Sequence, residues 1–153
     1  MQNGFMLLSF GSLSLVYITM ILGVYLSSVH QSLSCSEWPL CPNGFLKPPE
    51  QRYVVEYFHR IFVIFTAGAI YATSIFAYAK VKTMKRLTLL AAIVVSIQIL
   101  IGALVVTKKL DIMIVTAHLP IGVALFGITL LVFLRYRKDY LPSVNNGTSG
   151  NLD

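Results

Sequence analysis

The chain has 153 residues, of which 56% are hydrophobic and only 12% are charged, and its mean hydropathy is +0.75. A soluble domain of this length carries about twice that share of charged residues, so the composition excludes an ordinary water-soluble globule. The net charge is +6, but the cations stand at the ends of apolar runs and form no basic patch interleaved with aromatic residues. We therefore expect no nucleic acid partner.

Four long apolar runs account for this composition. They cover residues 5–26, 53–79, 87–107 and 112–134, and each is near or above the ~20 residues that a helix needs to cross about 30 Å of hydrocarbon. The sequence predicts an all-α membrane protein, with residues 1–140 forming a four-transmembrane-helix bundle in the lipid bilayer. The first run lacks a basic leading segment and is longer than the apolar part of a signal peptide, so we expect it to be retained.

The placement of the basic residues predicts the topology. Seven cations lie close to the ends of the second and fourth runs, against four in the remaining loops. By the positive-inside rule, the N- and C-termini are cytoplasmic and the protein is a multi-pass protein of the cell membrane. One long extracytoplasmic loop, residues 27–52, and a tight outer turn at residues 108–111 follow from this topology. The polar segment 141–153 is expected to be a disordered cytoplasmic tail.

The long outer loop contains both cysteines of the chain, Cys35 and Cys41. A zinc site would require shorter spacing and two further ligands nearby. A loop outside the membrane permits a disulfide instead. Two interpretations remain open: a bond that only stabilises the loop, and a bond that is reduced and re-formed during function.

The second run opens with the segment Glu56-Tyr57-Phe58-His59-Arg60. Ionisable residues at membrane depth are costly, and they are a functional-site hypothesis by default. Glu56 and His59 are three residues apart and share one helix face, whereas Glu56 and Arg60 have the spacing of an ion pair along a helix. Such a pair would explain the acid and the arginine but would leave His59 without a role.

His118 is the other histidine inside an apolar run. It follows Asp111 by seven residues, as His59 follows Arg52 by seven, so each imidazole is predicted to lie about 10 Å from the outer side. Two imidazoles at one depth in a bundle could bind one heme iron from opposite faces. The alternative is that each ring is a polar residue packed against its neighbours. Gln98 in the third run is expected to donate an interhelical hydrogen bond of about 1 kcal/mol, with contact to a ligand as the second possibility.

Four segments together resemble the heme A synthase family of cytochrome oxidase assembly proteins. They are the Cys-x-x-Trp-Pro-x-Cys pattern of residues 35–41, the Glu-x-x-His-Arg pattern of residues 56–60, residues 98–104, and Ala117-His118-Leu119. The resemblance implies an oxidoreductase that converts a methyl group of heme O to the formyl group of heme A for terminal oxidases. It implies His59 and His118 as axial ligands of the iron of heme b or heme O, and Arg60 as a further heme-binding residue. It also implies Glu56 as the family's functionally important carboxylic residue, with a catalytic role in accepting protons, and Cys35 with Cys41 as the outer-loop cysteine pair.

Well-known members of that family have eight helices in two similar halves, and the four runs here correspond to one half. We therefore expect a homo-oligomer, most simply a twofold dimer, with heme O synthase or a terminal oxidase as further candidate partners. The rival function is a non-enzymatic heme b protein with two histidine ligands, an electron carrier or heme-handling factor that does not need Glu56. A small transporter or structural module without a cofactor is a weaker alternative.

Overall fold

A computed structural model describes residues 2–29, 38–39, 51 and 54–148. In this part of the chain the helices are α1 (Gln2–Ser28), α2 (Val54–Lys80), α3 (Lys85–Thr107) and α4 (Ile112–Thr148), and the short 3-10 helix η2 (Lys82–Met84) joins α2 to α3. Each of the four α-helices includes a span that is long and apolar enough to cross a membrane. The predicted all-α membrane fold with four spanning helices is confirmed.

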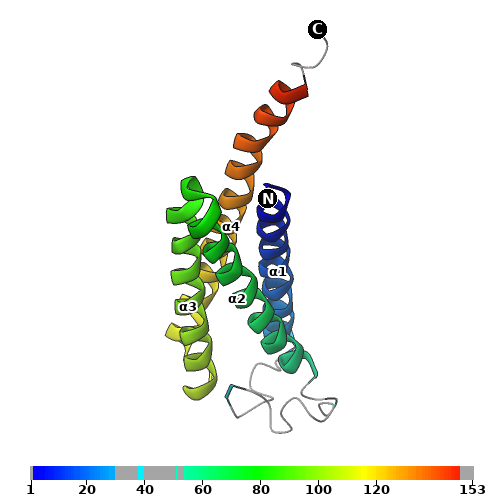
Figure 1. Ribbon diagram of the computed structural model, residues 1–153. Helices are drawn as coiled ribbons and strands as arrows, with labels where there is room; N and C mark the ends of the chain where they lie inside the picture. The colour runs from blue at the N-terminus through cyan, green and yellow to red at the C-terminus, as the bar shows by residue number, and fades with distance from the viewer. Residues whose placement is uncertain (1, 30–37, 40–50, 52–53, 149–153) are drawn as a thin grey trace.

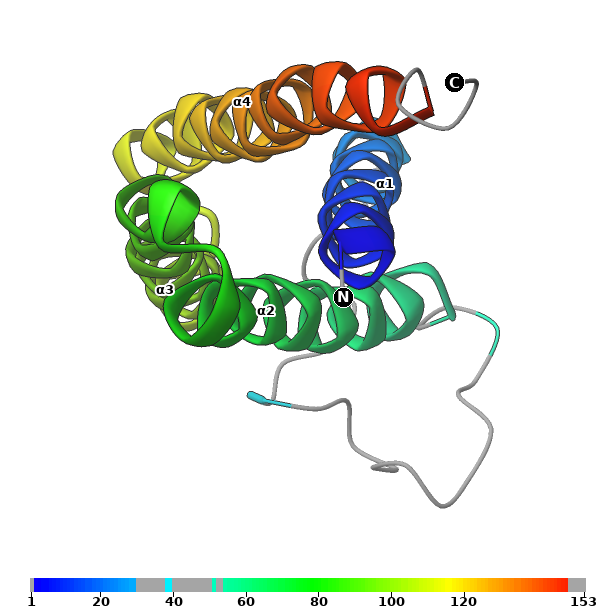
Figure 2. The same cartoon turned by 45° about the horizontal axis from the view of Figure 1, so that its top comes forward.

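The four helices form a ring in which each packs against the helices before and after it, and α4 closes the ring against α1 (Figure 2). Consequently α2 and α4 face each other across the bundle. The start of α1 and the α2–α3 connection lie at one end, called here the inner end, and α4 leaves the bundle there (Figure 1). The α3–α4 turn and the start of α2 lie at the opposite end, called the outer end.

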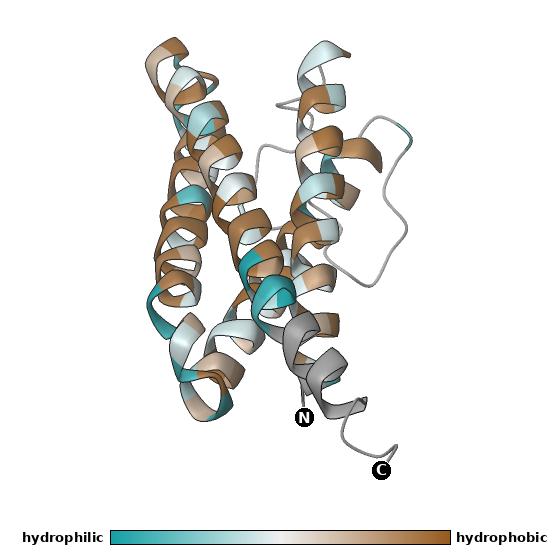
Figure 3. Cartoon of the chain, turned by 90° about the horizontal axis from the view of Figure 1, so that it is seen from above, coloured by the Kyte–Doolittle hydropathy of each residue, from teal (hydrophilic) through white to brown (hydrophobic). Residues whose placement is uncertain are grey.

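The outward surface is apolar and the interior contains small and hydroxyl-bearing residues. Leu7, Ile75, Ile112 and Met113 expose 70% or more of their surface, and hydrophobic residues cover long stretches of the helices (Figure 3). Lipid solvates such side chains well, so the helices associate through close packing and hydrogen bonds instead. The interhelical hydroxyl contacts are Ser12 with Thr73 at 2.9 Å, Thr19 with Thr66 at 2.8 Å, and Tyr71 with Ser96 at 2.8 Å.

The tight turn predicted between the third and fourth helices is confirmed at the outer end. Lys109 and Leu110 have φ angles of 52° and 63°, which turn the chain sharply through a conformation that residues with a Cβ seldom adopt. The Asp111 carboxylate then accepts hydrogen bonds from the backbone N–H groups of Met113 (3.0 Å) and Ile114 (3.3 Å). Asp111 therefore caps the N-terminus of α4 and sets where that helix begins.

The structure differs from the expected disordered tail over residues 141–148. There α4 continues as a helix as far as Thr148. The physical reason is cooperativity: a helix that is already nucleated gains a backbone hydrogen bond from each added residue that has an N–H group, so polar residues can extend it beyond the apolar run.

Candidate functional site

His59 lies on α2, five residues after the first residue of that helix, Val54. Its ring packs against Gly23 of α1, where a Cβ atom would come within 3.2 Å of the imidazole Cε1. The backbone of Thr19, one turn earlier on α1, lies beside the ring. The buried Nδ1 atom has no hydrogen-bond partner among the described residues. Glycine at position 23 therefore provides the space that the ring occupies.

His118 lies on α4, six residues after Ile112, and has a corresponding environment. Its ring packs against Gly102 of α3, where a Cβ would come within 3.4 Å of the imidazole Cε1. The Gln98 side-chain amide donates to the His118 backbone carbonyl at 3.0 Å, and its Nε2 lies 3.3 Å from the ring Nε2. The predicted interhelical hydrogen bond of Gln98 is confirmed, and its partner is the second histidine.

The two helical hairpins thus repeat one arrangement, a glycine on the first helix and a histidine on the second. Gly23 lies five residues before the end of α1 at Ser28, and Gly102 lies five residues before the end of α3 at Thr107. Both rings consequently lie within about two turns of the outer end, on helices that face each other across the bundle. The structure agrees with the equal depth predicted from residue counting.

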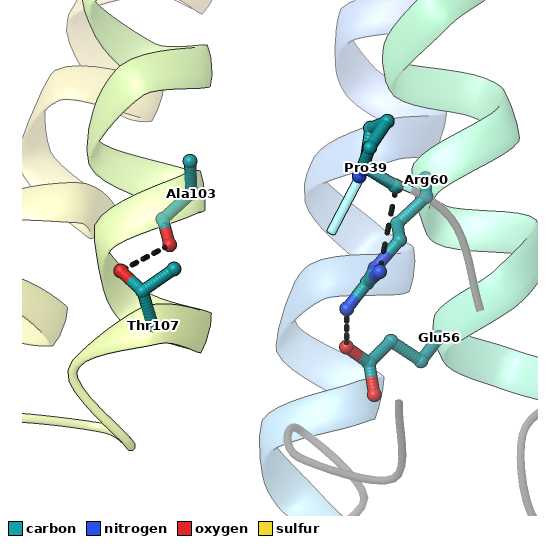
Figure 4. A network of polar contacts seen from close by, with 5 residues as sticks. All are labelled: Pro39, Glu56, Arg60, Ala103 and Thr107. Atoms are coloured by element: carbon teal, nitrogen blue, oxygen red, sulfur yellow. Dashed lines mark hydrogen bonds and ion pairs between the residues drawn. The ribbon is translucent and has the colours of Figure 1, made fainter. Parts of the chain in front are cut away.

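Glu56 and Arg60 form an ion pair on α2, one turn apart (Figure 4). The Glu56 side chain is 3% exposed and that of Arg60 is 11% exposed, so the pair is largely shielded from solvent. Arg60 Nη1 also donates to the backbone carbonyl of Pro39 in the outer loop at 3.4 Å. The expected ion pair along the helix is confirmed, and the arginine links it to the loop. The heme-binding role suggested for Arg60 stays a prediction.

The chemistry of the two imidazoles at the outer end fits the binding of a heme iron. Imidazole nitrogens are common axial ligands, and a buried polar atom without a partner requires an explanation such as an unrecorded ligand or water. Both histidines have such an atom in Nδ1, and Gln98 has another in Oε1. The ring Nε2 of His118 is covered by the Gln98 amide. Binding of a metal through that nitrogen would therefore require Gln98 to move.

Sequence reasoning did not identify Thr19, Gly23 and Gly102 as parts of the site. The two glycines did have a signal in the sequence, because each stands at the same distance from the outer end of its helix. The signal becomes specific only when the rotation of each helix about its axis is known, since that rotation decides which neighbour the glycine faces. The predicted cysteine pair, Cys35 and Cys41, lies outside the described residues, so the disulfide stays a prediction.

Comparison with known proteins gives a consistent set of relatives. Residues 46–151 match the model of a family described as cytochrome oxidase assembly protein. The chain is 29% identical over 137 residues to a heme A synthase of Bacillus licheniformis, covering 84% of this chain and 45% of the relative. It is 32% identical over 130 residues to a heme A synthase of Geobacillus kaustophilus, covering 80% of this chain and 40% of the relative.

A third relative, the heme A synthase of Macrococcus caseolyticus, is 29% identical over 124 residues, which cover 77% of this chain and 41% of the relative. The chain therefore spans less than half the length of these curated relatives. The matched segments include both histidine-bearing helices.

Proposed function

The chain belongs to the cytochrome oxidase assembly protein family, and we propose that it is a heme A synthase-type oxidoreductase. The proposed reaction oxidises a methyl group of heme O to the formyl group of heme A for terminal oxidase assembly. The observation that carries the proposal is the pair of imidazoles His59 and His118, which approach the same outer part of the bundle from facing helices. Four-helix bundles commonly build cofactor sites in this way.

In this proposal His59 and His118 would hold the heme through their imidazoles, and the bound heme would supply a redox-active iron. Gly23 and Gly102 leave room for the two rings. The Thr19 backbone lies beside the His59 ring, and the Gln98 amide lies 3.3 Å from the His118 ring Nε2. Polar groups in such positions orient a ligand ring and select the nitrogen that is available to a metal. The site is thus supported by residues of all four helices.

Glu56 is the proposed proton acceptor. Oxidation of a methyl carbon to a formyl carbon removes protons as well as electrons and adds an oxygen atom from water, so a base near the substrate is required. Glu56 lies three residues before His59 on the same helix, and Arg60 balances its charge. The electron acceptor would be an oxidised heme iron or another one-electron oxidant of the membrane.

One observation favours the second candidate, a non-enzymatic heme b protein with two histidine ligands. The Glu56–Arg60 pair is buried and Arg60 also binds the Pro39 carbonyl, so Glu56 has a structural role that does not depend on catalysis. An electron carrier or heme-handling factor would use the two histidines in the same way. The two candidates differ in what happens to heme O.

Extraction of heme from the purified protein distinguishes these functions. The chain is produced in cells that also make heme O, and its heme is analysed by chromatography and mass spectrometry. The synthase predicts hydroxymethyl or formyl derivatives that are absent when Glu56→Ala is produced instead. Heme b alone, in both proteins, would support the non-enzymatic function.

The location, membrane orientation and assembly of the protein are further parts of the proposal, and each can be tested separately. We propose the cell membrane as the location, cytoplasmic termini, and a homo-oligomer, most simply a twofold dimer, with heme O synthase or a terminal oxidase as candidate partners. Cysteine-accessibility labelling at positions 82 and 109 would test the orientation, because Lys82 and Lys109 lie at opposite ends of the bundle. Native mass spectrometry of the full chain would give the number of copies.

A further inference from the structure

A hollow of about 740 Å³ lies at the inner end of the bundle, far along the helices from the two histidines. Residues of η2, the first two turns of α3, and α4 line it together. Its lining residues are Lys82, Thr83, Lys85, Arg86, Leu87, Leu90 and Arg135. The hollow is therefore formed by two segments that are about fifty residues apart in the chain.

Four of the lining residues are cations. Lys82, Arg86 and Arg135 are exposed, and Lys85 is partly buried with its Nζ 3.9 Å from the centre of the Tyr78 ring. In the described part of the chain, no carboxylate forms an ion pair with any of the four. Like charges gathered in one hollow repel one another, and an anion placed between them would relieve that repulsion.

Two of the remaining lining residues are apolar. Leu87 and Leu90 lie on the first turns of α3, and Leu90 is 45% exposed. The exposed side chains of Leu89 and Ile93 continue this apolar surface along α3 toward the middle of the membrane. A ligand that suits both the cations and this apolar surface is therefore anionic at one end and hydrocarbon at the other.

We propose that this hollow binds the phosphate headgroup of an anionic phospholipid, with an acyl chain lying along Leu87 and Leu90. Basic pockets between transmembrane helices on the cytoplasmic side are known to hold such headgroups. A free phosphate ion would satisfy the cations but would make no contact with the apolar surface of α3. The proposal is independent of the heme chemistry at the outer end.

The competing explanation is a diffuse attraction between all inner cations and the membrane surface, as the positive-inside rule alone would give. The chain offers a matched pair of variants that separates the two. Lys82→Gln, Arg86→Gln and Arg135→Gln together remove three cations from the hollow. Lys80→Gln, Arg137→Gln and Lys138→Gln remove three cations from the same end of the molecule at positions that do not line it.

The experiment is native mass spectrometry of the full chain, released from nanodiscs of zwitterionic lipid that contain a small fraction of phosphatidylglycerol. Each direct contact between a cation of the hollow and the phosphate contributes about a fivefold factor in affinity, so the hollow variant is expected to retain the anionic lipid about 100-fold less well. The wild type and the control variant should retain it equally. Circular dichroism checks that both variants keep the helical content of the wild type.

Equal loss in both variants would overturn the proposal in favour of diffuse attraction, and loss in neither would overturn it by showing that the cations of the hollow do not hold the lipid. A further arm adds inorganic phosphate to the detergent-solubilised protein. Displacement of the lipid by millimolar phosphate would mean that the hollow recognises a phosphate ion alone, and would overturn the assignment to a phospholipid. Persistence of the lipid supports it.

Discussion

The close packing of Gly23 against His59 makes a quantitative prediction about heme binding. In Gly23→Ala, the new Cβ would lie 3.2 Å from the imidazole Cε1, whereas carbon atoms in contact prefer about 3.5–4.0 Å. The ring must therefore shift by a few tenths of an ångström or leave its preferred rotamer. A strained rotamer costs about 0.5–1.5 kcal/mol, which corresponds to heme affinity weaker by about 2- to 12-fold.

The assay is titration of the heme-free protein with hemin, followed by the Soret absorbance. Gly11→Ala is the matched control, because it lies on the same helix and its new Cβ would have no neighbour within 4 Å. Both changes raise helix propensity by a similar amount, so that contribution cancels in the comparison. Gly102→Ala should be intermediate, since its Cβ would meet the His118 ring at 3.4 Å. Equal heme affinity in Gly23→Ala and Gly11→Ala would refute the reasoning.

Three further predictions address other parts of the site and its support. Glu56→Ala should keep its bound heme but form no formyl product, and full conversion by this variant in the extraction assay would remove Glu56 from the chemistry. Gln98→Leu should lower the free energy of unfolding by about 1 kcal/mol, because the bond to the His118 carbonyl is lost; unfolding in mixed micelles measures this, and unchanged stability would contradict it. Asp111→Ala should cost about 1 kcal/mol through loss of the α4 cap; Asp139→Ala, at an exposed position on the same helix, is the control and should cost much less.

The membrane-spanning helices were predictable from the sequence because one physical requirement, an apolar length that matches the bilayer, dominates their composition. The predicted run at 87–107 differs from α3 (Lys85–Thr107) by only two residues at its start. The depth of His59 and His118 was also predictable, since the rise per residue in a helix is constant and both residues could be counted from the outer ends of their runs.

The partners of those residues were not predictable, because they depend on how each helix is rotated and on the path of the outer loop. Gln98 was expected to bond across helices, but only the packing of α3 on α4 selects His118 as its partner. The contact between Arg60 and the Pro39 carbonyl depends on where the loop returns to the bundle. The continuation of α4 to Thr148 reflects helix propagation, which an analysis of hydropathy does not detect.

The central claim is that His59 and His118 bind the same heme iron. Electron paramagnetic resonance of the purified ferric protein tests it most directly, using His59→Ala and His118→Ala beside the wild type. The account predicts a low-spin signal with two imidazole ligands in the wild type and its loss in each single variant. A low-spin signal of this kind that persists unchanged in either variant would contradict the account.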